Sequence, residues 1–367
     1  MNSDSSYAQS NCVSRKGCFV ACLLFVSPLS YSQNYPKPIE GDFVISDFKF
    51  SQGGDLKKLN QHYATIGKPV RNNAGQVTNA VLVMHGTGGT GGGFLNERFA
   101  GNLFGPGQLL DATKYFIILP DAIGHGKSSK PSEALKMKFP EYTYDDMVKA
   151  QYQLLTEHLG VNHVRLVTGT SMGGMMTWVW GYRYPDFMSA LMPLASLPVE
   201  IAGRNRMMRK MMIDAIKNDP EWKNGDYETQ PAGMTNAIHI LIFMVSVPMQ
   251  WQKTAPTRVE AETMLQSLVD RYRASNDAND MLYQFNASRL YNPAPHLEKI
   301  MAPLFAINSA DDQVNPPELG VMEREIKRVK KGRYILLPIT DQTRGHGTHS
   351  IPAIWGNYLA ELLKSSE

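Results

Sequence analysis

Cysteine is scarce in this sequence, and its location is informative. The 367 residues include three cysteines, Cys12, Cys18 and Cys22, and the chain has none from residue 33 onward. That cysteine-free part cannot form disulfides, use a thiolate nucleophile or bind a metal through sulfur. The sequence also has no cluster of histidine and carboxylate residues with metal-ligand spacing, so we expect no bound metal.

An excess of charge of one sign is lacking as well. The chain has 37 basic and 34 acidic residues, a net charge of +3 with neutral histidines, and the two signs are interspersed. Neither a basic stripe nor an acidic tail is present, so we expect no nucleic-acid partner. Hydrophobic residues make up 43% of the chain, enough for one large α/β domain with an insertion or for two small domains.

The N-terminal residues have the pattern of a signal peptide. Two basic residues precede an apolar run from 17 to 29, and small residues stand at positions −3 and −1 before Gln33. The run is shorter than the ~20 residues of a membrane-spanning helix, although an N-terminal anchor or a buried strand are the alternatives. We predict removal of residues 1–32 by cleavage between Ser32 and Gln33, a periplasmic or secreted protein, and no stable membrane span afterwards.

Short apolar runs bounded by turn residues recur in the remaining chain. Such runs are typical of parallel strands buried on both faces. Two earlier segments, 43–50 and 59–65, resemble an antiparallel edge hairpin. Helical segments alternate with the runs, the clearest from Tyr144 to Leu159 with Thr143 as N-cap. The pattern predicts a mostly parallel, doubly wound α/β sheet. The runs are 80–84, 116–119, 165–167, 191–194, 304–307 and 334–337.

The alternation stops between residues 196 and 292. This stretch is helix-rich and contains many methionines but no convincing buried strand. We predict a helical cap inserted after the sixth strand. The methionines and aromatic residues would either line an adaptable apolar pocket or pack between helices. The predicted organisation is a leader at 1–32, core segments at 33–195 and 293–367, and a cap at 196–292.

The most informative motif is the Gly-x-Ser-x-Gly of residues 169–173. An apolar run precedes it and a helix-like segment follows, which is the setting of a nucleophile elbow. The glycines leave room for the tight turn. A helix N-terminus beside the serine would stabilise developing negative charge. Ser171 is therefore the predicted nucleophile.

A serine nucleophile needs a base, and the base needs an acid to orient it. In this type of site the acid follows a late strand and the histidine lies near the C-terminus. Asp312, in an Asp-x-x-x-Pro segment, is the predicted acid, with Asp311 as the alternative. His346 follows a glycine and is the predicted base, with His349 as the alternative. A surface histidine and a capping aspartate would be the non-catalytic interpretation.

The oxyanion of the reaction needs two backbone N–H groups. We expect one from Met172, directly after the nucleophile, and one from Thr87 in the glycine-rich loop after the third strand. That loop also matches Gly-x-Gly-x-x-Gly at residues 86–91. No acidic residue ends the next strand, however, as a dinucleotide site would require. We therefore expect no bound cofactor.

Together these motifs resemble the α/β-hydrolase superfamily. From about residue 79 to 350, the chain is similar to its homoserine O-acetyltransferase branch. In that branch the elbow serine accepts the acyl group, and Ser171, Asp312 and His346 match its triad. The resemblance also implies a homodimer that pairs through the cap. The matching pieces are Gly105–Gly107, Asp111 with Lys114–Ile118, Asp146–Gln151, Ser171–Met175, Tyr184–Asp186 and Asp219–Trp222 with Gly225–Tyr227.

Several positions depart from that branch. The oxyanion loop at 85–89 reads His-Gly-Thr-Gly-Gly instead of His-Ala-Leu-Thr-Gly, and Ile213 stands where the branch has a cap arginine. We therefore expect the groups that hold an amino-acid acceptor to be missing, and an exported enzyme would meet little acyl-CoA. We predict an exported serine hydrolase that cleaves a carboxylic ester or related acyl bond of a small molecule. An acyltransferase of the homoserine O-acetyltransferase type is the alternative, and a non-catalytic binding protein on the same scaffold is a third.

Overall fold

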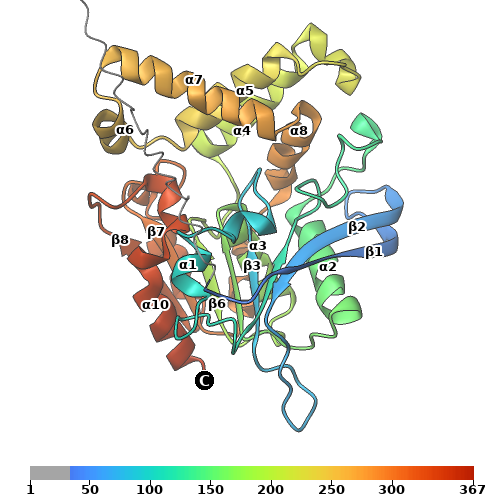
Figure 1. Ribbon diagram of the computed structural model, residues 1–367, viewed down its shortest axis with the longest axis vertical. Helices are drawn as coiled ribbons and strands as arrows, with labels where there is room; N and C mark the ends of the chain where they lie inside the picture. The colour runs from blue at the N-terminus through green and yellow to red at the C-terminus, as the bar shows by residue number, and fades with distance from the viewer. Residues whose placement is uncertain (1–33) are drawn as a thin grey trace, which may run out of the picture. The chain divides into compact units, whose positions relative to one another are not determined.

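The computed structural model describes residues 34–367, which contain one eight-stranded sheet (Figure 1). The strand order is β1-β2-β4-β3-β5-β6-β7-β8. β1 and β2 form an antiparallel hairpin, β2 pairs antiparallel with β4, and the strands from β4 to β8 are parallel. The strands are β1 Ile39–Lys49, β2 Asp55–Ile66, β3 Ala80–Met84, β4 Phe116–Pro120, β5 Leu166–Thr170, β6 Leu191–Leu194, β7 Leu304–Ser309 and β8 Gly332–Leu337.

The central strands are buried along their whole length, because helices cover both faces of the sheet. In β3, Leu82 contributes to the core that contains residues of α2 (Tyr144–Gln153) and α3 (Met172–Arg183). The neighbouring Val83 contributes to a second core, with residues of α1 (Ala100–Leu103) and α10 (Pro352–Ser365). The predicted mostly parallel, doubly wound sheet is therefore confirmed.

The predicted helix from Tyr144 to Leu159 begins where expected. The Thr143 side chain accepts a hydrogen bond from the Asp146 backbone N–H, and Asp146 completes a capping box. The regular helix ends at Gln153 and continues as one π-helical turn over Leu154–His158. Gly160 follows with φ of +63°, a conformation that favours glycine.

Five helices form a cap between β6 and β7, as predicted for an insertion after the sixth strand. Figure 1 shows them gathered beyond one end of the strands. Some cap methionines pack between helices and others line a pocket, so each of the two interpretations is correct for different residues. Met212 and Met234 are fully buried between helices, whereas Met244 and Met264 line a cavity. The cap helices are α4 Gly203–Lys217, α5 Ala232–Met244, α6 Pro248–Thr254, α7 Arg258–Ser275 and α8 Ala278–Asn286, and α9 is Val321–Glu325 after β7.

The predicted signal peptide, residues 1–32, lies outside the described residues. Within residues 34–367, no single helix is long and apolar enough to cross a membrane. The α5 and α6 helices satisfy the length and composition criteria only as a pair, and that pair is bent by 105°.

Candidate active site

Ser171 lies in the sharp turn between β5 and α3. Its φ of 55° and ψ of −109° are unfavourable for a residue with a side chain, a kind of strain that concentrates at functional sites. The flanking glycines make the turn possible: a Cβ on Gly173 would overlap the carbonyl oxygen of Met84, and one on Gly169 would overlap the Gly173 backbone. The sequence therefore presents the serine at the carboxyl end of a central strand.

The structure brings three predicted side chains into one chain of hydrogen bonds. Ser171 Oγ lies 2.8 Å from His346 Nε2, and His346 Nδ1 lies 2.9 Å from Asp312 Oδ2. Asp312 also accepts a hydrogen bond from Asn315 Nδ2 at 3.0 Å and one from the Val314 N–H at 2.8 Å. With Nδ1 donating to Asp312, His346 Nε2 is free to accept the serine proton.

The environment keeps Asp312 ionised although the residue is only 1% exposed. Burial by itself would raise the pKa of this carboxyl. The neighbouring charge and hydrogen bond of His346, together with the bonds from Asn315 and Val314, outweigh burial and lower the pKa. A buried carboxylate of this kind can orient and stabilise a protonated histidine.

The two alternative residues do not join this chain. Asp311 accepts a hydrogen bond of 2.5 Å from Ser309 Oγ and has no hydrogen bond to His346. The His349 ring lies 5.4 Å from the His346 ring, and its buried Nδ1 has no hydrogen-bond partner in the described part of the chain. Burial, aided by the His346 charge, lowers the pKa of His349 to about 3, so its ring is neutral.

The two predicted oxyanion donors lie on either side of Ser171. Met172 is the first residue of α3, where a backbone N–H has no acceptor within the helix. The loop that contains Thr87 runs against the serine, since a Cβ on Gly86 would lie 3.4 Å from Ser171 Cβ. His85 fixes this loop: its Nδ1 lies 2.8 Å from Gly86 O, and its Nε2 accepts a hydrogen bond from the Ala122 N–H. Burial lowers the pKa of His85, which favours this neutral form.

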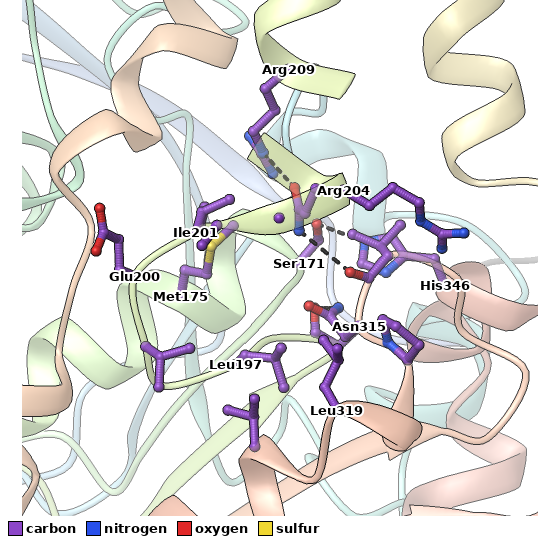
Figure 2. A pocket seen from close by; sticks show the side chains of 18 residues that line it. Ser171, Met175, Leu197, Glu200, Ile201, Arg204, Arg209, Asn315, Leu319 and His346 are labelled. Carbon is purple, nitrogen blue, oxygen red and sulfur yellow. Dashed lines mark hydrogen bonds between the residues drawn. The ribbon is translucent and has the colours of Figure 1, made fainter. Parts of the chain in front are cut away.

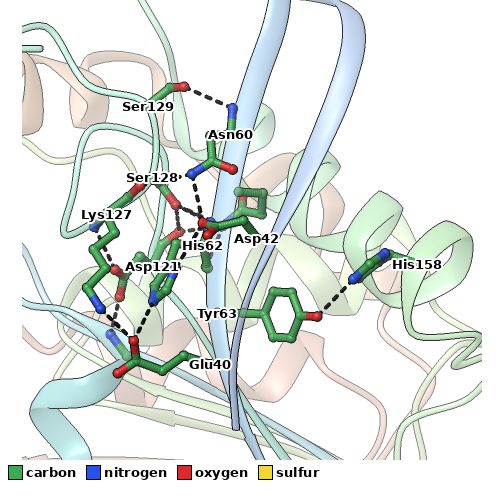
Figure 3. A network of polar contacts seen from close by, with 12 residues as sticks. Glu40, Asp42, Asn60, His62, Tyr63, Asp121, Lys127, Ser128, Ser129 and His158 are labelled. Atoms are coloured by element: carbon green, nitrogen blue, oxygen red, sulfur yellow. Dashed lines mark hydrogen bonds and ion pairs between the residues drawn. The ribbon is translucent and has the colours of Figure 1, made fainter.

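The glycine-rich loop is held by a carboxylate of the chain itself (Figure 3). Asp121 Oδ1 accepts a hydrogen bond from the Gly91 N–H at 2.7 Å, and Oδ2 accepts one from the Lys127 N–H at 2.8 Å. The Asp121 carboxylate therefore joins the glycine-rich loop to the segment after β4. In residues 34–367 no group of three or more histidine, cysteine, aspartate or glutamate residues could hold a metal ion.

Two cavities meet at Ser171. The first has a volume of about 380 Å³ and an apolar lining that includes Met175, Leu197 and Ile201 (Figure 2). The second, of about 490 Å³, lies under the cap and is lined by residues of α5, α6, α7 and α8 and by Thr87. Four residues line both cavities: Ser171, Arg209, Val314 and His346.

Arg209 is a site residue that the sequence analysis missed. It lies on α4, is only 3% exposed, and donates from Nε to Asn205 Oδ1 at 2.9 Å and from Nη1 to Ser288 Oγ at 3.3 Å. Ile213 replaces the cap arginine of the branch, but the cap places a different cation, Arg209, at both cavities from one helical turn earlier. The available signal was an arginine on the same helical face as the buried Met212 and Ile216.

Comparison with known proteins agrees with this fold. The family model described as alpha/beta hydrolase fold matches residues 79–335. The chain is 31% identical over 281 residues to a "Probable acyltransferase" of Methanothermobacter thermautotrophicus, covering 76% of this chain and 85% of that protein. It is 29% identical over 347 residues to a homoserine O-acetyltransferase of Pelobacter propionicus, covering 84% and 91%.

A solved structure of an acetylester hydrolase from Corynebacterium glutamicum superposes with a TM-score of 0.77 at 22% identity, covering 89% of this chain and 96% of that one. At that identity the likeness shows the fold alone. The matched family model spans most of the sheet and the whole cap. The chain is thus an enzyme of the α/β-hydrolase family, close to its homoserine O-acetyltransferase branch.

Proposed function

We propose that this enzyme is an acyltransferase that carries an acyl group on Ser171 and passes it to an alcohol. The observation that carries the proposal is the meeting of two cavities at Ser171 and His346. One cavity has room for the acyl group while the other admits the second substrate. The similarity to proteins named as acyltransferases, over 76% and 84% of this chain, supports transfer rather than hydrolysis.

In the first half of the reaction, His346 Nε2 takes the Ser171 proton as the serine oxygen attacks the donor carbonyl. The Thr87 and Met172 amides stabilise the oxyanion, and Asp312 stabilises the protonated histidine. His346 then gives the proton to the leaving group. The product is an ester between the acyl group and Ser171.

In the second half, an acceptor hydroxyl loses its proton to His346 and attacks the acyl carbon. The proton returns to Ser171 Oγ as the acyl–serine bond breaks, which restores the enzyme. The largely apolar first cavity suits the acyl chain, because Met175, Leu197 and Ile201 offer it apolar contacts. The cap-side cavity is left for the acceptor.

Ester hydrolysis is the second candidate. The specific observation in its favour is the glycine-rich loop at 85–89, which lacks the sequence of the transferase branch. The proposed export would also separate the enzyme from acyl-CoA. The other argument for hydrolysis is the expected loss of the groups with which the branch holds its amino-acid acceptor; Arg209, which lines both cavities, is a cation that could serve an acceptor from another position.

The test is how the acyl-enzyme is partitioned between water and alcohols. Purified enzyme would receive p-nitrophenyl acetate or acetyl-CoA together with millimolar L-homoserine, glycerol or 1-propanol. Mass spectrometry would then measure acetyl ester against free acetate. We expect one alcohol to yield more ester than acetate. Acetate as the sole product with every alcohol would select hydrolysis.

Ser171→Ala is the control for both candidates. Its turnover should fall by a factor on the order of 10⁴ or more, with the melting temperature retained. A fluorophosphonate probe should label the wild-type enzyme at Ser171. Turnover that survives in the variant would refute the nucleophile, and an unlabelled wild-type serine would leave the non-catalytic interpretation.

A further inference from the structure

Arg209 is a buried charge without a counter-ion. Its side chain comes from α4 toward the junction of the two cavities (Figure 2). Among residues 34–367, no carboxylate lies within 4.0 Å of it, and its hydrogen-bond acceptors are the neutral oxygens of Asn205 and Ser288. A buried cation is ordinarily paired, because removing it from water is costly unless an anion compensates.

Two buried hydroxyl groups, those of Tyr144 and Thr87, lie near this guanidinium. Neither has a partner at normal hydrogen-bond geometry in the described part of the chain, although Tyr144 is close enough to Ser288, Arg209 and Thr87 for weak hydrogen bonds. Tyr144 lines neither cavity, whereas Thr87 and Arg209 both line the cap-side cavity. Because buried polar groups are usually satisfied within the protein, Arg209 and the Thr87 hydroxyl are the groups that a polar ligand in this cavity would satisfy.

We propose that Arg209 binds a carboxylate of the substrate where the two cavities meet, with the Thr87 hydroxyl as a second donor. The inference rests on the proposed function, since it names the substrate class of the Ser171 site. The unpaired N–H groups of a planar guanidinium match the two oxygens of a carboxylate.

The surroundings favour a carboxylate over an anion of higher charge. Arg209 is the single buried arginine or lysine in residues 34–367. One carboxylate balances its charge, whereas a phosphate dianion would leave net negative charge against an apolar lining. Arg204 and Glu200 also line the first cavity and Arg344 lines the second, but all three are exposed to solvent, and Arg204 donates to the backbone oxygen of Gln313.

A purely structural role is the competing explanation. Arg209 links α4 to the segment after α8 through Ser288, and its guanidinium lies 5.7 Å from the Phe285 ring. In that role, substitution would weaken reactions of all substrates equally. In the proposed role, substitution would weaken specifically those that carry a carboxylate.

Two matched pairs of substrates separate these explanations and locate the carboxylate. The acyl-side pair is mono-p-nitrophenyl glutarate against p-nitrophenyl butyrate. The acceptor-side pair is 4-hydroxybutyrate against 1-butanol, each with p-nitrophenyl acetate as donor. We expect the charged member of one pair to have the higher kcat/KM by about 10- to 100-fold, the range of a charge-assisted hydrogen bond.

In Arg209→Met this ratio should fall toward one, and Arg209→Lys should retain part of it. The matched control is Lys210→Met, on the same helix, which removes an exposed lysine that pairs with Asp214. The ratio should be unchanged in that variant. No preference for either charged member, or a preference that Arg209→Met leaves intact, would overturn the proposal.

Binding to Ser171→Ala separates this inference from the proposed function. Glutarate or 4-hydroxybutyrate should raise the melting temperature of that variant, and glutaramide or 1-butanol should not. A shift of this kind, with a wild-type serine that resists fluorophosphonate, would keep the carboxylate site and reject acyl transfer. If the probe labels Ser171 but carboxylates change neither the melting temperature nor kcat/KM, the carboxylate site would be rejected and acyl transfer through Ser171 would be kept.

Discussion

Two polar regions of this molecule differ in whether their charged side chains have partners within the protein. Around the β1–β2 hairpin, Asp42 lies 2.9 Å from His62, Glu40 lies 2.5 Å from Lys127, and both Asp121 oxygens accept backbone N–H groups (Figure 3). Around Ser171, Arg209 has no anion in the described part of the chain. The acidic groups of the first region are paired within residues 34–367, whereas Arg209 in the second has no anionic partner there.

This difference separates structural polar groups from functional ones. Paired buried groups hold segments together, as Asp121 holds the glycine-rich loop to the segment after β4. Unpaired buried groups weaken the fold unless a ligand binds, and the positive φ of Ser171 adds strain of the same kind. Substitutions in the hairpin region should therefore reduce stability, and those around Ser171 should reduce activity.

The largest effect is expected for the acid beside His346. Asp312→Asn should lower kcat by about 10⁴-fold, because an amide would favour the wrong histidine tautomer and cannot stabilise the imidazolium. The measurement is turnover of p-nitrophenyl acetate. Asp311→Asn is the matched control, since Asp311 contacts Ser309 rather than His346. Equal losses in the two variants would contradict the geometry of this site.

A smaller effect, on stability, is expected in the hairpin region. Asp121→Asn places an amide NH₂ where a carboxylate oxygen accepts a backbone N–H, so urea unfolding should show a loss of about 3 kcal/mol. Asp42→Asn, at a half-exposed pair, should lose less than about 1 kcal/mol. If Asp121→Asn unfolded at the wild-type urea concentration, Asp121 would not be holding this loop.

The sequence predicts the reactive centre better than the pocket, for a physical reason. The elbow around Ser171 depends on steric demands within five residues, and the chain order of Asp312 and His346 follows from the sheet. The choice between Asp311 and Asp312 depends on how one loop folds, which neighbouring residues do not determine. Arg209 was missed because its role depends on how α4 packs against α8 and the sheet, and such packing joins distant parts of the chain.

The prediction of function is limited in the same way, by features that depend on packing between distant parts of the chain. The motifs correctly predict an α/β-hydrolase fold. They do not determine whether water or an alcohol receives the acyl group, because that depends on the shape and polarity of the cap-side cavity. A single position, Ile213, was a poor guide to that polarity, since helical residues one turn apart share a face.

Asp280 in α8 has features of both regions, and its effect on stability should be smaller than that of Asp121→Asn. Its carboxylate accepts two hydrogen bonds from Ser132, at 2.8 and 2.6 Å, but no cation lies within 4.0 Å among residues 34–367. Burial raises the pKa of Asp280 to about 6, although the Ser132 bonds oppose this. Because the folded-state pKa is above the unfolded value, its contribution to stability is present below about pH 4 and lost as pH rises through 6.

The wild-type protein should therefore lose stability relative to Asp280→Asn between pH 4 and 7, by an amount on the order of 2 kcal/mol. Asparagine is neutral throughout this range and can keep a hydrogen bond to Ser132. Urea midpoints of both proteins, measured at half-unit pH steps, would give the difference. A difference that stays constant with pH would mean that Asp280 titrates as an exposed carboxyl does, and that its two hydrogen bonds from Ser132 compensate fully for burial.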